Sequence, residues 1–332
     1  MSRKNNEKIE SASVNPSRRL QFVGQYILAF MLLLFLLMAP CSGLCVEIVG
    51  IKFLFDISDG FDEPSDVAVS KDGRIYVVDG VNNRIKTYDS NGKSVSSFGA
   101  EGSGNGQFRY PLGIDVDDSG KIYIADSGNH RVQIFDRNAA FMAKIDLPIK
   151  GTTPADPTDV AVDTARDRIY VVDNDNHRIF FYTLSTLKPE KSVGAPGEQD
   201  LMFRYPFLMT LDRGGDLYVV DVINTRVQAI NPEGLFITDI GGWGVEKGEF
   251  FRPKGVAADA SGRIFVSDSY MGVVQVFDTW GEFQGVLGDF NKKAIQKFKT
   301  PVGLFVDDRN RIYVVEMLAN RVSVYGIETE GK

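Results

Sequence analysis

Six copies of one short apolar string constrain this chain more than any other feature of its sequence. Each copy ends in an acidic residue, and successive acids are 47, 47, 48, 47 and 48 residues apart. A proline precedes every copy at nearly the same distance, so a whole segment repeats rather than a single motif. A fixed period of this length is typical of repeat architectures, in which each unit packs against its neighbours. The strings IYVVD, IYIAD, IYVVD, LYVVD, IFVSD and IYVVE end at Asp79, Asp126, Asp173, Asp221, Asp268 and Glu316.

Each repeat predicts four short strands joined by tight turns. An apolar strand follows the proline, and a turn that contains glycine in four repeats leads to the string, which is apolar on both faces. A strand of this kind is buried on both sides. A third strand and a weaker fourth strand complete the unit. The sequence therefore predicts an all-β, six-bladed β-propeller of four-stranded antiparallel blades, which begin near residues 64, 111, 157, 206, 253 and 301.

A spare strand before the first repeat predicts how the ring closes. The last repeat has three clear strands and lacks a fourth, whereas residues 46–56 (VEIVGIKFLFD) precede the first repeat without a place in it. We expect residues 46–56 to complete blade six, because an unpaired sheet edge is otherwise left open. The propeller domain then spans residues 46–328.

The first 45 residues differ in kind from the repeats. Residues 22–39 are uncharged and apolar and follow two arginines, Arg18 and Arg19, which predicts one N-terminal apolar helix about 27 Å long. Arginines on that side favour export of the segment that follows. Residues 1–45 are read either as a cytoplasmic tail with a membrane anchor or as a cleaved signal peptide. Lipidation at Cys41 or Cys45 stays a further possibility.

Charge and cysteine content narrow the expected location and partners. Residues 46–332 carry a net charge of about −10 and contain no cysteine. Nucleic-acid binding usually requires a basic face, so no nucleic-acid partner is expected. Without disulfides an exported domain must rely on core burial. We expect an exported monomer without a cofactor, in the periplasm or on the outer side of the cytoplasmic membrane, and in contact with that membrane if residues 22–39 are retained.

The repeated pattern resembles the NHL repeat. The pattern consists of a proline, an apolar strand, G-x-I-Y-V-x-D, and then x-x-N-x-R-[IV], and residues 126–135 (DSGNHRVQIF) match it almost throughout. The resemblance covers all six copies and implies a six-bladed scaffold. It does not select a ligand, because similar domains bind proteins, RNA or peptides, and others are lyases or lactonases.

The acid that ends the string is followed by an arginine in five of the six repeats, and this recurrence predicts a structural role. A catalytic group is needed once, whereas a group that satisfies the backbone of a tight turn is needed in every blade. The fifth repeat lacks the arginine, and both drift and a contact site are open explanations. The recurring pairs are Asp79 with Arg84, Asp126 with Arg131, Asp173 with Arg178, Asp221 with Arg226, and Glu316 with Arg321, and Asp268 stands without an arginine.

Few residues point to metal chemistry. The only histidines, His130 and His177, occupy equivalent turn positions in neighbouring repeats, a blade width apart, which is too far for both to bind one ion. The resemblance implies histidine- and metal-dependent lyases, so this spacing disfavours them here. Lactonase-like propellers are thought to use channel acids, and the weak candidates here are Asp66 and Asp159. No catalytic residue is predicted.

The loops that link successive repeats carry the strongest candidate binding residues. Arginine and aromatic residues recur before the prolines, a combination typical of binding hot spots. The cations either pair with acids of the same loops or form a rim for an acidic peptide, a carboxylate or a glycan. The candidates are Arg109, Tyr110, Arg204, Tyr205, Trp243, Arg252 and Lys299. The adjacent phenylalanines, Phe108, Phe203, Phe250 or Phe251, and Phe298, are expected to fill the core between blades.

Two functions are therefore predicted. The first is a non-enzymatic scaffold or sensor domain that binds a protein or peptide, with acidic partners among those expected, through rigid loops on one face. The alternative is an extracytoplasmic enzyme of the lyase or lactonase type with a metal in the central channel.

Overall fold

A computed structural model describes residues 47–149 and 153–328. The chain divides into two compact units, Met1–Cys45 and Val46–Lys332, and all described residues belong to the second unit. The predicted apolar helix at residues 22–39 and both cysteines lie outside the described residues. Within the described part, no helix is long and apolar enough to cross a membrane. Its helical elements are two 3₁₀ turns, η1 (Ser127–Asn129) and η2 (Met317–Ala319).

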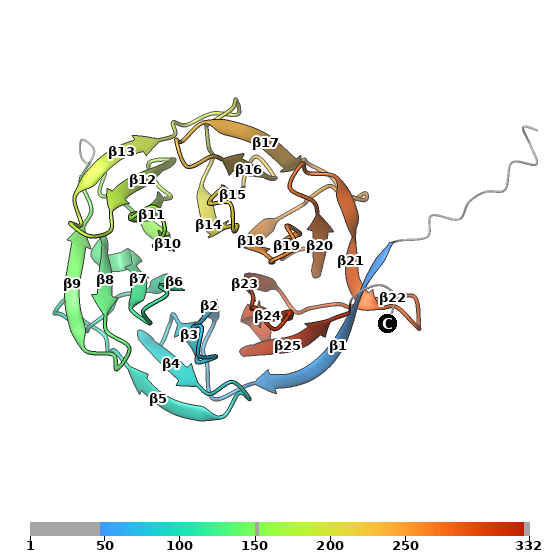
Figure 1. The fold of residues 1–332 in the computed structure, drawn as a ribbon, viewed down its shortest axis with the longest axis horizontal. Helices are drawn as coiled ribbons and strands as arrows, with labels where there is room; N and C mark the ends of the chain where they lie inside the picture. The colour runs from blue at the N-terminus through green and yellow to red at the C-terminus, as the bar shows by residue number, and fades with distance from the viewer. Residues whose placement is uncertain (1–46, 150–152, 329–332) are drawn as a thin grey trace, which may run out of the picture. The chain divides into compact units, whose positions relative to one another are not determined.

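The first four repeats each form one four-stranded antiparallel sheet, and the sheets stand around a central channel as the blades of a propeller (Figure 1). In each blade the strands follow chain order from the channel outward (Figure 1). The innermost strands are β2 (Pro64–Val69), β6 (Pro111–Val116), β10 (Pro157–Asp163) and β14 (Pro206–Leu211). The second strands are β3 (Ile75–Asp79), β7 (Ile122–Asp126), β11 (Arg168–Asp173) and β15 (Leu217–Asp221). The outer two in each blade are β4 (Arg84–Tyr88) and β5 (Ser94–Phe98), β8 (Arg131–Phe135) and β9 (Phe141–Asp146), β12 (Arg178–Thr183) and β13 (Pro189–Val193), and β16 (Arg226–Ile230) and β17 (Phe236–Gly241).

The last two repeats form one nine-stranded sheet, so the expectation of six separate blades is corrected to four blades and one joined sheet. The cause is β1 (Ile48–Ile57), which pairs antiparallel with β25 and also pairs parallel with β21 from Ile48 to Gly50. β1 thus lies beside β25 in the position of a fourth strand and continues past it (Figure 1). The strands are β18 (Pro253–Ala258), β19 (Ile264–Asp268), β20 (Val273–Phe277), β21 (Phe283–Asp289), β22 (Ala294–Ile295), β23 (Pro301–Val306), β24 (Arg311–Glu316) and β25 (Arg321–Ile327).

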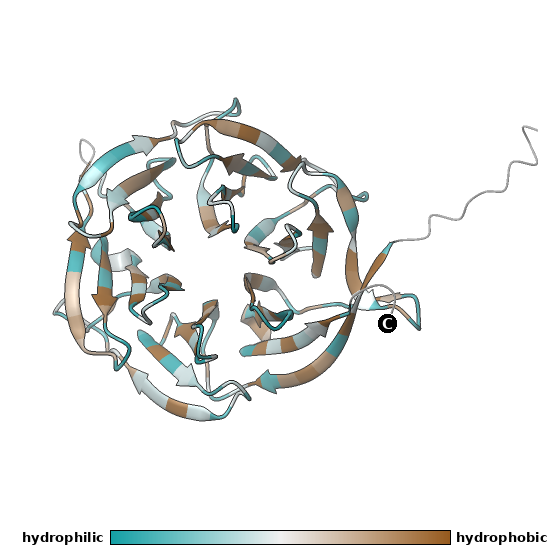
Figure 2. Cartoon of the chain, viewed as in Figure 1, coloured by the Kyte–Doolittle hydropathy of each residue, from teal (hydrophilic) through white to brown (hydrophobic). Residues whose placement is uncertain are grey.

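Buried apolar residues form clusters between successive repeats. Tyr76 and Val78 of the first repeat, for example, pack with Ile122 and Phe135 of the second. Another cluster contains residues of both the last and the first repeat, so the packing is continuous around the ring. Figure 2 shows the apolar residues along the strands and hydrophilic residues in many of the connecting turns. Each sheet therefore buries both of its faces, as strings apolar on both sides require.

At four of the five passages from one repeat to the next, a phenylalanine fills the space between the repeats. In the third of these positions the buried residue is Phe250, whereas Phe251 stacks on Tyr270 with ring centroids 4.2 Å apart. Gly241 ends β17 with φ of 85°, and the Phe250 ring lies where a Cβ of residue 241 would stand, so this position requires glycine. The four buried phenylalanines are Phe108, Phe203, Phe250 and Phe298.

Candidate functional site

One side of the ring, which we call the loop face, is built from the turns after the strings and the segments that lead into each proline. Its six turn acids are buried, and each accepts a hydrogen bond from a backbone N–H 17 residues earlier in the chain. Turn and connecting segment are therefore fixed to each other in every repeat. The segments are residues 58–63, 99–110, 153–156, 194–205, 242–252 and 296–300.

Each turn arginine forms an ion pair with its turn acid inside the fold. Arg131 donates from Nε to Asp126 at 2.8 Å, and its other nitrogens donate to the carbonyls of Ser103, Gly104 and Gln107 in the preceding segment. The Nε atoms of the remaining four arginines donate to their acids in the same way. The distances are 2.7 Å for Arg84, 2.9 Å for Arg178, 3.1 Å for Arg226 and 2.8 Å for Arg321.

A glutamine seven residues after the acid completes this device in three repeats, and the sequence reasoning missed it. The Nε2 of Gln133 donates to the Gln107 carbonyl at 2.7 Å and to Asp126 at 2.9 Å, while its oxygen accepts from the Gly106 N–H. The sequence did carry a signal for this role, because a glutamine recurs two residues after two of the turn arginines. The three residues are Gln133, Gln228 and Gln275.

The histidines occupy a slot that links one repeat to the next. The backbone of residues in this slot has the left-handed conformation, with φ of 57° at His130 and 56° at His177. Nδ1 of His177 accepts a hydrogen bond from the Tyr205 N–H at 3.1 Å, and Nδ1 of His130 contacts the Ala155 carbonyl at 2.9 Å. Asn83 and Asn320 hold the same type of contact, to the N–H groups of Tyr110 and Glu63. The slot thus selects residues that tolerate positive φ and carry a short polar side chain.

The fifth repeat replaces the missing side chains with backbone donors. Asp268 accepts hydrogen bonds from the N–H groups of Tyr270 and Met271 in addition to those of Phe251 and Arg252. The carboxylate is therefore satisfied without asparagine or arginine, and the side chains of this turn are released from that role.

The loop face displays several aromatic and aliphatic side chains. The predicted residues Trp243, Tyr110 and Tyr205 are 75%, 60% and 49% exposed. Sequence reasoning missed further exposed residues that stand two positions after the turn acid, although their recurrence there was a signal. These are Val81, Ile223, Tyr270 and Leu318.

The predicted cations of the loop face fall into two groups. Arg204 forms an ion pair with Glu198 at 2.8 Å, so one of the two open interpretations, pairing within the same loop, describes this residue. Arg109, Arg252 and Lys299 are exposed, and their side chains make no ion pair or hydrogen bond with the described residues. Their backbone N–H groups are held by turn acids, so the main chain is fixed while the charged ends face solvent.

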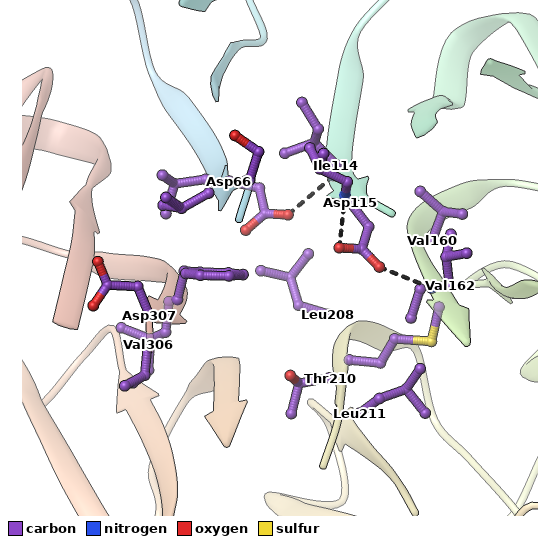
Figure 3. A pocket seen from close by; sticks show the side chains of 18 of the residues that line it. Asp66, Ile114, Asp115, Val160, Val162, Leu208, Thr210, Leu211, Val306 and Asp307 are labelled. Carbon is purple, nitrogen blue, oxygen red and sulfur yellow. Dashed lines mark hydrogen bonds between the residues drawn. The ribbon is translucent and has the colours of Figure 1, made fainter. Parts of the chain in front are cut away.

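The central channel contains a cavity of about 330 Å³ lined by inner strands and by the turns that follow them (Figure 3). The weak metal candidates Asp66 and Asp159 line it, and so does Asp115, which the sequence reasoning missed. Each carboxylate accepts a backbone N–H from the next repeat: Ile114 at 3.0 Å, Met209 at 2.7 Å and Val162 at 2.8 Å, respectively. Figure 3 shows Asp66 and Asp115 on neighbouring strands beside Leu208.

Burial keeps these three carboxyl groups protonated to unusually high pH. Burial raises the pKa of Asp66 to about 8 and that of Asp115 to about 7. Burial and then the charge of Asp66 raise the pKa of Asp159 well above its usual range. Across the described residues no three His, Cys, Asp or Glu side chains are grouped to hold a metal ion. Both histidine Nδ1 atoms face backbone groups, and the channel acids accept backbone N–H groups, so the donor set does not fit a metal.

Asp66→Asn is expected to stabilise the protein more at pH 8 than at pH 5. An unfolded aspartate releases its proton near 3.8, whereas Asp66 holds its proton to about 8, so wild-type stability falls as pH rises through this window. The slope is up to about 1.4 kcal/mol per pH unit for one proton, and the neutral amide does not titrate. Urea unfolding at both pH values measures the difference. Asp136→Asn in a surface turn is the control, and an equal effect of the two substitutions at both pH values contradicts the prediction.

Comparisons with known proteins agree with this architecture. The NHL repeat model matches residues 61–88, 108–135 and 155–182, which are the first three repeats. Protein brain tumor of Drosophila melanogaster is 28% identical over 148 residues, which is 42% of this chain and 14% of that protein. The fold is a β-propeller, and the family match shows that its first three repeats are NHL repeats, as the sequence predicted.

Solved structures of similar fold include two lyase structures. A streptogramin B lyase structure superposes with a TM-score of 0.61 at 14% identity and covers 84% of this chain and 97% of that chain. A catalytically inactive variant of virginiamycin B lyase from Staphylococcus aureus, crystallised with quinupristin, gives 0.59 at 12% identity and covers 87% and 97%. A protein of unknown function from Bacteroides thetaiotaomicron gives 0.62 at 17% identity and covers 85% and 75%. At these identities the likeness shows the fold alone.

Proposed function

We propose that this chain is a non-enzymatic binding scaffold whose loop face engages a protein partner. One observation carries the proposal: Arg109, Arg252 and Lys299 are exposed without partners among the described residues, on a face that also displays Tyr110 and Trp243. Arginine, tyrosine and tryptophan are the residues most often found at the energetic centres of protein interfaces. Propellers of NHL repeats commonly mediate protein interactions, which supports the same reading.

The rigidity of the loop face supports recognition without rearrangement. Every connecting segment with a candidate cation is tied to a buried turn acid by its main chain. A ligand therefore meets side chains whose backbone is already ordered, and ordering costs little on binding. The exposed cations favour a partner that carries acidic residues, because complementary charge speeds and orients association.

The combined substitution Arg109→Ala, Arg252→Ala and Lys299→Ala is expected to weaken partner capture at least about tenfold, since each loses a charged contact. Full-length protein is immobilised, extracts of the cells that produce it are passed over, and proteins retained by wild type are quantified. The matched control replaces Lys93, Lys188 and Arg309, which are exposed in turns at the opposite ends of the strands. Equal retention by both triple variants would place the interface elsewhere.

We also propose that the repeats lie outside the cytoplasm. The support is the sequence of residues 22–39, the arginines before it and the absence of cysteine from residues 46–332. A domain without cysteine offers no thiol that an oxidising compartment could cross-link, so its fold does not depend on the redox state of its surroundings.

A lyase- or lactonase-type enzyme is the second candidate. The channel cavity with its three buried carboxyl groups favours it, since perturbed acids in a cavity are typical of active sites. The likeness to the two lyase structures supports a shared fold and identifies no catalytic residue in this chain. Turnover of a substrate that Asp66→Asn abolishes, with the fold intact, would favour this candidate over the scaffold.

A further inference from the structure

One aromatic side chain of an innermost strand packs against residues of other repeats. Phe207 stands on β14, directly after Pro206, and its ring packs against a cluster that contains Val67 of β2 and Val302 of β23. Figure 1 shows β14 across the channel from β2 and β23. Phe207 therefore reaches from β14 toward the first and last repeats, and we call its ring the channel floor.

A lysine lies on this floor without a counter-charge. Nζ of Lys254, from the start of β18, is 4.5 Å from the centre of the Phe207 ring. The ammonium makes no hydrogen bond or ion pair with the residues that the structure describes, and the residue keeps partial access to solvent. Burial and then the nearby charge of Arg252 lower the pKa of Lys254, and no carboxylate offsets them.

In the fifth repeat the turn binds the main chain of Arg252 and leaves its side chain unpaired within the described residues. The Arg252 N–H is bound by Asp268, and its carbonyl accepts hydrogen bonds from Ser269, while its guanidinium is exposed and unpaired within the described residues. Arg252 and Lys254 are two residues apart in the chain, and the charge of Arg252 acts on Lys254. A partly buried cation without a partner is costly, and an anionic group that contacts both cations removes that cost.

We propose that Lys254 and Arg252, above the Phe207 ring, form a binding site for a carboxylate of an aspartate or glutamate side chain on the partner polypeptide. The inference rests on the proposed function of the loop face. The loop face also displays Tyr110, Tyr205 and Trp243, so the chain on either side of the acidic residue has surface to contact. An internal side chain therefore suits the site better than a chain end.

Carbon-13 NMR of the reductively methylated full-length chain tests the site with small probes, since dimethyl-lysine keeps its charge and one N–H. N-acetylglutamate amide is expected to shift the Lys254 resonance saturably and to raise its pKa, whereas N-acetylglutamine amide leaves both unchanged. Lys254→Gln assigns the resonance by its loss. Arg252→Gln is expected to weaken the response about tenfold, through the loss of one charged contact, and Lys93→Gln is the matched control without effect.

Several outcomes overturn the inference. These are no shift, an equal shift with the neutral probe, and an equal effect of Arg252→Gln and Lys93→Gln. A stronger response to N-acetylleucine, whose only carboxylate is terminal, overturns the side-chain assignment. The two proposals fail separately: a responsive Lys254 with undisturbed capture by the loop-face triple variant removes the proposed function, and lost capture with a silent Lys254 removes this site.

Discussion

An Asp126→Ala protein is expected to lose about 3–5 kcal/mol of its free energy of unfolding, which is typical when one partner of a buried ion pair is removed. The Asp126 carboxylate is inaccessible to solvent and accepts hydrogen bonds from Arg109, Asn129, Arg131 and Gln133. Alanine leaves the guanidinium of Arg131, itself buried, without its counter-charge. Urea unfolding followed by circular dichroism measures the loss.

Asp136→Ala is the control for this substitution. Asp136 also accepts two backbone N–H groups in a turn, from Asn138 and Ala140, but it lies near the surface and pairs with no arginine within the described residues. Its replacement is expected to cost about 1 kcal/mol. A loss from Asp126→Ala no larger than this would show that the turn acid does not support the fold as the structure indicates.

Removal of residues 46–56 is expected to abolish the single cooperative unfolding transition. The deletion uncovers the edges of β21 and β25, to which β1 is bonded, and it removes Ile51 from the apolar cluster of the last two repeats. Exposed strand edges also promote aggregation. Thermal unfolding and light scattering compare the shortened and full-length chains.

A peptide of residues 46–57 added to the shortened chain is expected to restore part of the transition, and a scrambled peptide of equal composition is not. Restoration by both peptides, or an unfolding curve unchanged by the deletion, would contradict a closing role for β1.

The repeat strings allowed the strand pattern to be predicted from the sequence. The joined sheet of the last two repeats could not be predicted in this way. A string such as IYVVD encodes burial on both faces, and burial determines which strands pack inside a blade. The parallel pairing of Ile48–Gly50 with β21 uses backbone groups, which every sequence carries, so no residue pattern announces it. The correction from six blades to four blades and a joined sheet follows from this.

The candidate sites were predictable only in part. Asp115 had a visible signal, because it stands four residues after the proline, where the other repeats have alanine, threonine or phenylalanine. The difference between Arg204, which is paired with Glu198, and Arg109, which is not paired within the described residues, depends on side-chain reach. The contact of Lys254 with Phe207 joins two repeats through the channel, and their separation along the chain conceals it.

The pairing of β1 with β25 also sets a time at which folding can finish. Ile51 pairs with Ile327, so β1 cannot pair with β25 until nearly all repeats have been synthesised. At ordinary rates of translation this interval is on the order of tens of seconds. During it the ring is open and the chain lacks its final cooperative contacts. During this interval, other components of the cell can bind the chain, deliver it or translocate it before the ring closes.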